Sequence, residues 1–143
     1  MLQPAASSRN GLSTLLLPDS INFISVMPDQ SLRDLVKAIK ESTRNIFPVV
    51  DEKNQFLGLI PLDNVRDIMF DTEVYDSVFV KDLLIDPPMV INLNDSMEEV
   101  MNKFKDTGLW NLPVVENGKY LGFVSRANIF NAYRKLLVEF SED

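Results

Sequence analysis

The sequence predicts an α+β fold built from two copies of one strand-helix-strand-strand-helix (βαββα) unit. Three features indicate it: a hairpin pattern that occurs twice, a serine-capped amphipathic helix before each hairpin, and an apolar strand before each helix. Pro48 and Pro113 occupy equivalent hairpin positions 65 residues apart, whereas Gly58 and Gly122 are 64 residues apart. One residue is therefore missing from the turn of the second copy, where loops tolerate deletions best. We interpret the chain as an internal duplication.

Each predicted hairpin consists of two apolar strands around a polar turn. In the second copy, residues 111–125, the turn is Asn117-Gly118. This is the strongest short hairpin signal, because both residue types tolerate positive φ. In the first copy, residues 46–60, the turn is the longer Asp51-Glu52-Lys53-Asn54. It lacks the alternating oxygen ligands and terminal Glu of a calcium loop, so we interpret it as a turn only.

A helix with a serine N-cap precedes each hairpin. Ser31 opens the first, Asp34 lies at the capping-box position, and the apolar stripe at i, i+3, i+4 and i+7 is Leu32, Leu35, Val36 and Ile39. Ser96 opens the second, Glu99 completes Ser-x-x-Glu, and the stripe is Met97, Val100, Met101 and Phe104. Gly108 supplies a positive-φ stop. The copies thus agree in cap and stripe.

The remaining elements complete the two units. Short strands are predicted at residues 21–26 and 89–91, and Val78-Phe79-Val80 is either a short strand or a turn. A second helix follows each hairpin; its apolar residues are Val65, Ile68 and Met69 in the first copy and Ile129, Phe130, Tyr133, Leu136 and Leu137 in the second. The resulting division is 1–13 leader or linker, 14–70 repeat 1, 71–79 connection, 80–138 repeat 2 and 139–143 tail. A unit of about 50 residues cannot bury a sheet face alone, so we expect the repeats to pack sheet to sheet with helices outside.

Composition excludes several classes of function. The net charge of −7 opposes binding to nucleic-acid phosphates and anionic lipid. No apolar run reaches the ~18–20 residues of a membrane helix, and no basic segment marks a signal peptide, so we expect a soluble piece without direct membrane insertion. The absence of Cys removes disulfides and fits a cytosolic setting. Without His or Cys, and without a phosphate-binding glycine motif, we expect neither an enzyme nor a metal site.

The order βαββα, the Leu-Pro-Val-Val hairpin and the Gly-x-x-Ser helix start resemble the cystathionine β-synthase (CBS) domain, here as a tandem pair over residues 20–137. Three runs resemble more narrowly the cytoplasmic CBS pair, or Bateman module, of bacterial ClC-family voltage-gated chloride channels and transporters. They are Val80-Lys81-Asp82-Leu83-Leu84-Ile85-Asp86-Pro87-Pro88, Thr107-Gly108-Leu109-Trp110-Asn111-Leu112-Pro113-Val114 and Gly122-Phe123-Val124-Ser125-Arg126-Ala127-Asn128-Ile129-Phe130.

The resemblance implies adenosine-compound sites in the clefts of a CBS pair. In the family pattern, a Ser or Thr three residues after the glycine and an Asp six after it contact phosphate or ribose. The second copy has Ser125 and Asn128 there, and the first has Pro61 and Asn64. We therefore expect one partial adenine-nucleotide site, formed by Met89, Val90, Asn111, Leu112, Pro113, Ser125, Arg126 and Asn128. A degraded second cleft would contain Ile24, Phe47, Pro48 and Asn64. No cofactor is required, and AMP, ADP, ATP or adenosine is the expected ligand class.

Each candidate residue also has a purely structural interpretation. Ser125 at a helix start is an N-cap about as readily as a ligand contact. Met89, Val90, Leu112 and Pro113 would wall a purine, but core packing explains them more simply. Trp110 could stack on a base, yet we expect it to plug the interface between the copies. Arg126 adjoins a helix N-terminus, where free N–H groups favour a phosphate.

The resemblance implies a non-catalytic regulatory module of a ClC-type chloride channel or transporter. It would lie at the cytoplasmic face of the inner membrane, contact the membrane domain of the parent protein, and form a homodimer through its helices, for which Phe130, Tyr133 and Leu137 are candidates. The alternatives are a ligand-free dimerisation scaffold, the CBS pair of another transporter, or a stand-alone adenylate sensor.

Overall fold

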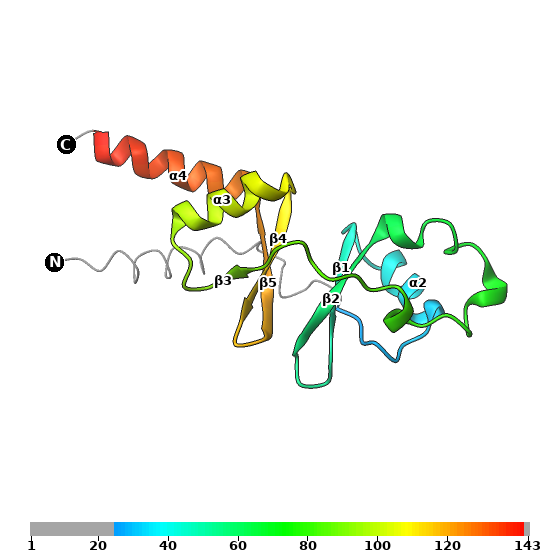
Figure 1. Cartoon of the computed structure of the whole chain (residues 1–143). Coiled ribbons are helices and arrows are strands. Elements are labelled where there is room, and N and C mark those ends of the chain that lie inside the picture. The colour runs from blue at the N-terminus through cyan, green and yellow to red at the C-terminus, as the bar shows by residue number, and fades with distance from the viewer. Residues whose placement is uncertain (1–24, 142–143) are drawn as a thin grey trace. The chain divides into compact units, whose positions relative to one another are not determined.

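The structure, a computed structural model, describes residues 25–141, which divide into two compact units (Figure 1). Of the described residues, the first unit holds 25–87 and 118–120, and the second holds 88–117 and 121–141. Each unit pairs a small sheet with helical segments, which confirms the α+β class. The sheet-to-sheet packing of the two repeats stays a prediction.

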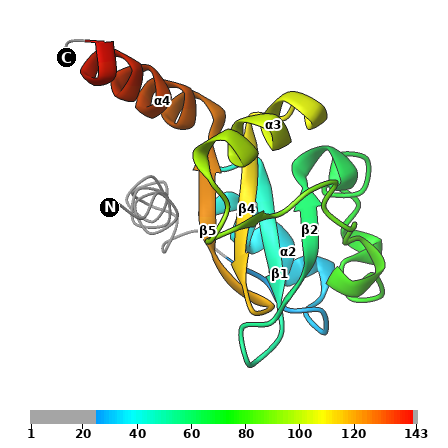
Figure 2. The same ribbon diagram turned by 60° about the vertical axis from the view of Figure 1, so that its left-hand side comes forward.

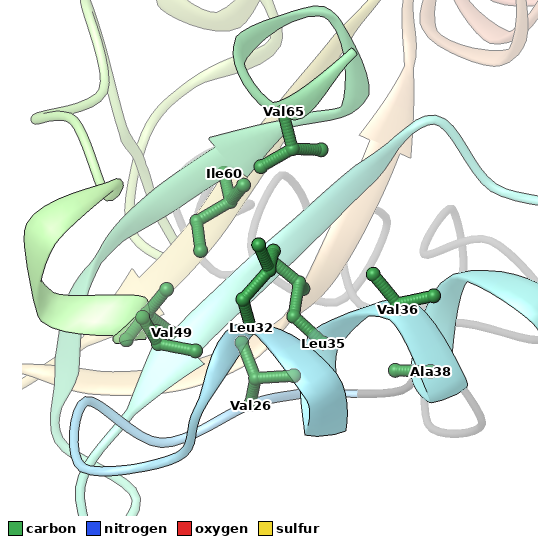
Figure 3. Packing of buried hydrophobic residues seen from close by; sticks show 9 residues of the cluster. Val26, Leu32, Leu35, Val36, Ala38, Val49, Ile60 and Val65 are labelled. Carbon is green, nitrogen blue, oxygen red and sulfur yellow. The ribbon is translucent and has the colours of Figure 1, made fainter. Parts of the chain in front are cut away.

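The first unit is built from α2 (Leu32–Lys40), β1 (Ile46–Val50) and β2 (Phe56–Pro61). β1 and β2 form an antiparallel hairpin whose register shifts between Val49 and Val50, and the parallel bridge from Val26 to Val49 extends this sheet. Buried residues of α2, of both strands and of three flanking segments form one core (Figure 3): Val26, Leu32, Leu35, Val36, Ala38, Val49, Ile60, Val65 and Val80. The predicted stripe on the first helix is therefore the face that packs on the sheet.

The segment expected to be a connection is hydrogen-bonded to the N-terminus of α2. The backbone N–H groups of Leu32 and Arg33 donate to the carbonyls of Val78 and Tyr75. The Arg33 side chain also donates two hydrogen bonds to Asp76, at 2.9 and 3.0 Å, which lowers the pKa of that carboxyl below its usual value. These contacts satisfy helix donors that would otherwise lack partners.

The second unit contains β3 (Ile91–Asn92), α3 (Met97–Thr107), β4 (Asn111–Glu116), β5 (Lys119–Ser125) and α4 (Arg126–Ser141). The sheet order is β3-β4-β5, with β3 parallel to β4. Both α3 and α4 contribute buried residues to the core of this unit. That core consists of Ile91, Val100, Phe104, Leu112, Val114, Val124 and Ile129. Figure 2 shows α4 continuing from the end of β5.

Local chemistry confirms the predicted duplication. Ser31 and Ser96 both cap their helices, and each forms both hydrogen bonds of a capping box, with Asp34 and Glu99. Gly108 ends α3 at φ 69°, as predicted. Asn117 and Gly118 have φ of 52° and 81°, the positive values that a tight hairpin turn of this type needs.

Three predicted elements differ from the structure. The strand expected at 89–91 forms at Ile91–Asn92, and the Val90 carbonyl just before it accepts a hydrogen bond from Lys103 Nζ. The second helix of repeat 1 is only a 3₁₀ turn at Leu62–Val65, followed by further turns. Its Asp and Asn residues favour local turns over helix. Of the strand at 21–26, residues 21–24 lie outside the described residues, and Val26 forms a single bridge.

The segment 78–80 resolves as a turn, since Phe79 makes one bridge to Ser31 and a 3₁₀ helix spans Val80–Asp82. Along residues 25–141, none of the helices combines the length and the apolar character that a membrane crossing requires.

Gly58 provides a test of the first unit's packing. Leu59 and Ile85 exchange two backbone hydrogen bonds, and a Cβ on Gly58 would lie 2.6 Å from the Ile85 carbonyl oxygen. Because backbone must move to admit a methyl group, we expect Gly58→Ala to lower the free energy of unfolding by about 1–3 kcal/mol, measured by urea denaturation. Gly108→Asn is the control: no atom lies within 4 Å of its Cβ, and Asn tolerates positive φ, so the loss should be below about 1 kcal/mol. Equal stability of Gly58→Ala and the unmodified chain would contradict the prediction.

Candidate site at the start of the last helix

The candidate site centres on the junction where β5 ends at Ser125 and α4 begins at Arg126. The Ser125 hydroxyl accepts a 3.0 Å hydrogen bond from the backbone N–H of Asn128. Ser125 is therefore the N-cap of α4, which confirms the structural interpretation of this residue. A capping hydroxyl still carries a proton that it can donate, so the cap does not exclude a ligand contact.

Arg126 lies between two aromatic rings. Its guanidinium carbon is 5.0 Å from the centroid of the Trp110 ring and 5.6 Å from that of Phe130, distances typical of cation–π contacts. The backbone N–H of Arg126 also donates to the Trp110 carbonyl at 2.8 Å. Trp110 is 71% exposed. The expectation that it plugs the interface between the two copies stays a prediction, and the contact that the structure shows for its ring is with the arginine.

The apolar candidates divide between core and surface. Leu112 and Pro113 are buried in β4, and Leu112 belongs to the core of the second unit. Met89 and Val90 are half-buried in the chain that leads into β3, and Asn111 is half-buried at the start of β4. Asn128 is half-buried in the first turn of α4. All eight candidates of the second repeat thus fall in one unit, with Leu112 serving chiefly as core.

Lys103 is a residue that the sequence analysis missed. Its ammonium donates to the Val90 carbonyl at 2.9 Å and to Asp95 at 2.6 Å, and the two side chains are only 21% and 12% exposed. Asp95 in turn accepts from the backbone N–H of Asn92. This ion pair fixes the chain beside Met89 and Val90. The one sequence signal for Lys103 is that it lies outside the apolar stripe of α3.

The first repeat has the same backbone frame without the same side chains. The backbone N–H of Leu62 donates to the Asn45 carbonyl at 2.8 Å, the counterpart of the bond between Arg126 and Trp110. Pro61 precedes the 3₁₀ turn and makes no side-chain cap. Phe47 and Pro48 are buried in β1, Asn64 is exposed, and Ile24 lies outside the described residues. Leu62, the residue equivalent to Arg126, is uncharged.

Across residues 25–141, there is no group of three or more His, Cys, Asp or Glu side chains that could hold a metal ion. The polar groups at the junction are a hydroxyl, an amide and a guanidinium, which bind oxyanions and sugar hydroxyls rather than transfer protons at neutral pH.

A family model for the CBS domain matches residues 18–71 and 80–135. The chain belongs to the CBS domain family, as a tandem pair. CBS pairs are generally regulatory rather than catalytic.

Solved CBS structures share the fold. CBSX2, a CBS-pair protein from Arabidopsis thaliana solved in complex with AMP, is 24% identical with a TM-score of 0.68, and the match covers 86% of this chain and 95% of that one. CbpB in complex with c-di-AMP is 16% identical with a TM-score of 0.72 and covers 96% and 97%. The CBS domain of a membrane protein from Sphaerobacter thermophilus is 17% identical with a TM-score of 0.63 and covers 90% and 91%.

Among curated relatives, a homoserine O-acetyltransferase of Methanosphaera stadtmanae is 25% identical over 130 residues, which are 88% of this chain and 26% of that protein. Two further archaeal relatives are covered over 63% and 40% of their length. This CBS pair therefore spans less than two thirds of each of these relatives.

The ion pair of Lys103 and Asp95 yields a stability prediction. Lys103→Met leaves Asp95 as a poorly solvated charge and removes a donor from the Val90 carbonyl, so we expect a loss of about 1–3 kcal/mol in the free energy of unfolding. The matched control is Arg66→Met, which breaks an ion pair with Asp63 whose side chains are 68% and 76% exposed; it should cost less than about 1 kcal/mol. Similar losses in both variants, measured by urea denaturation, would contradict the anchoring role.

Proposed function

We propose that this CBS pair is a non-catalytic regulatory module that binds an adenine nucleotide where β5 meets α4 in its second repeat. The observation that carries the proposal is that Ser125, Arg126 and Asn128 together begin a 16-residue helix. A helix of this length presents partial positive charge at its N-terminus, which favours a phosphate. The family pattern places phosphate and ribose contacts at Ser125 and Asn128, and the AMP-bound state of the similar CBSX2 supports the ligand class.

Charge favours a ligand with few phosphates. The chain has a net charge of −7, which opposes a triphosphate more than AMP or adenosine. Asn128 stands where the family pattern has Asp, so its bonds to ribose hydroxyls lack charge assistance. We therefore expect modest affinity, with AMP bound more tightly than ATP.

The first repeat supports one site per chain rather than two. Pro61 has neither hydroxyl nor N–H, and the segment after it is a 3₁₀ turn without a long helix axis. The buried Phe47 and Pro48 then serve the fold of their own unit. In the proposal this degraded cleft is structural.

We also propose that the parent protein is a ClC-type chloride channel or transporter, with the pair at the cytoplasmic face of the inner membrane. The three ClC-like runs in the sequence support this, as does the likeness to a CBS domain from a membrane protein. An antibody to this chain should then detect a membrane-bound species larger than 16.3 kDa in the source cells. A free 16.3 kDa species in the supernatant would favour a stand-alone sensor instead.

Homodimer formation through α4 is part of the proposal. The C-terminal half of this helix exposes Leu136, Val138 and Phe140 by 51%, 51% and 80%. Leu136 and Phe140 are four residues apart and therefore share one face of the helix. Exposed apolar side chains on one face favour a partner surface, and a symmetric dimer would cover that face twice. Sedimentation equilibrium of the chain, with Phe140→Ser for comparison, tests the assignment; a monomer at all concentrations would contradict it.

A ligand-free scaffold is the second candidate function, and specific contacts favour it. The Ser125 hydroxyl already caps α4, and the Arg126 guanidinium already stacks on Trp110 and Phe130. Both positions of the ribose-binding Asp are Asn in this chain. In this function the pair would only hold two copies of the parent together.

Thermal unfolding with excess AMP, ADP, ATP or adenosine separates the two functions. Binding to the folded state raises stability by RT ln(1 + [L]/Kd), about 2.7 kcal/mol at 100 times Kd. We expect AMP to raise the unfolding temperature of the unmodified chain, and Ser125→Ala to reduce this ligand-dependent increase. No increase with any of the four at millimolar concentration would favour the scaffold.

Ser96→Ala is the matched control for this experiment. It removes an equivalent helix cap, from α3, so both variants should lose about 0.5–2 kcal/mol of basal stability. Only Ser125→Ala should also reduce the AMP-dependent increase. If both variants keep the full increase, Ser125 does not contact the ligand.

A further inference from the structure

The stack of Trp110, Arg126 and Phe130 is the feature that the proposed function leaves unexplained. Arg126 is the one cation at the start of α4, yet the contacts of its guanidinium within residues 25–141 are with aromatic faces and not with a carboxylate. The counterpart positions in repeat 1 are Asn45, Leu62 and Arg66, which cannot form such a stack. The stack is thus confined to the repeat that holds the candidate site.

We propose that Trp110 and Arg126 form a phosphate-sensitive latch, which rests on the proposed nucleotide site. Without ligand, Trp110 and Phe130 hold the guanidinium; a ligand phosphate beside Ser125 draws it away from Trp110. Arg126 is then the residue that distinguishes a nucleotide from a nucleoside, and Trp110 is its positioning residue.

The geometry allows this exchange without disturbing the helix. The backbone of Arg126 is fixed by its hydrogen bond to the Trp110 carbonyl, and Ser125 caps the same turn. Only the side-chain torsions of Arg126 need to change, so the guanidinium moves while its Cα stays at the first position of α4. Arg126 itself is half-buried, and Trp110 is 71% exposed, so solvent reaches one face of the stack.

The balance of interactions favours the phosphate modestly. A cation–π contact at an exposed site is comparatively weak, whereas a paired Arg–phosphate contact is charge-assisted and bidentate. A ligand shifts two such states only by its difference in affinity for them. Adenosine lacks the phosphate, has no such difference, and therefore leaves the stack closed.

The tryptophan provides a direct readout, since the chain contains one Trp. Trp110 is excited at the red edge of its absorption, where adenine does not absorb. Its emission is recorded in parallel titrations with AMP and with adenosine. AMP should change the emission of Trp110 with the same midpoint as its binding curve from calorimetry. Adenosine should bind by calorimetry without that change.

Two substitutions test the roles of the pair. Trp110→Leu releases Arg126, so AMP affinity should rise about two- to fivefold, which corresponds to ~0.5–1 kcal/mol for an exposed cation–π contact, with adenosine affinity unchanged. Arg126→Met should lower AMP affinity about tenfold and leave adenosine affinity unchanged. Trp110→Phe keeps an aromatic face and should restore values near those of the unmodified chain.

The outcomes separate the latch from the proposed function. Two results would overturn the latch without contradicting the nucleotide site. The first is binding of AMP with unchanged Trp110 emission. The second is an AMP-to-adenosine affinity ratio that is the same in Trp110→Leu and Arg126→Met as in the unmodified chain. Absence of binding by either ligand in every variant overturns both the latch and the nucleotide site. Far-UV circular dichroism confirms that each variant retains its helices, so that a loss of binding is not a loss of folding.

Discussion

The hydrogen bond from the Arg126 backbone N–H to the Trp110 carbonyl determines where the candidate site lies. It joins the residue before β4 to the first residue of α4, which lie together at the open end of the β4-β5 hairpin. The same bond joins Leu62 to Asn45 in the first repeat. Because the frame is common to both repeats, the difference between them must come from the side chains attached to it.

The side chains and secondary structure that follow the two hairpins differ between the repeats. The second repeat continues from its hairpin into a 16-residue helix capped by Ser125, whereas the first continues from Pro61 into a 3₁₀ turn. A long helix and a capping hydroxyl favour the binding of an oxyanion. A proline at the same point has no hydroxyl and no N–H to donate to it. The two repeats therefore differ in side-chain chemistry as well as in secondary structure at this point.

The predictions that succeeded rest on local chemistry. The capping boxes at Ser31 and Ser96, the positive φ of Gly108 and the Asn117-Gly118 turn depend on residues close in sequence, so the pattern alone was sufficient. The strand predicted at 89–91 begins only at Ile91, and the hydrogen bond from Lys103 to the Val90 carbonyl before it is a contact that the local pattern does not predict. The contact between Trp110 and Arg126 was not predicted, because hydrophobicity alone gives no information about a neighbouring guanidinium.

The sequence by itself determined the duplication, the α+β class, the CBS family and the candidate residues at Ser125, Arg126 and Asn128. Tertiary structure alone decided which of their groups are already engaged: Ser125 caps α4, Arg126 stacks between Trp110 and Phe130, and the ion pair of Lys103 and Asp95 anchors the chain at Val90. The reason is physical. Caps and turns follow from neighbours along the chain, whereas the partner of a long charged side chain depends on segments that only folding brings together.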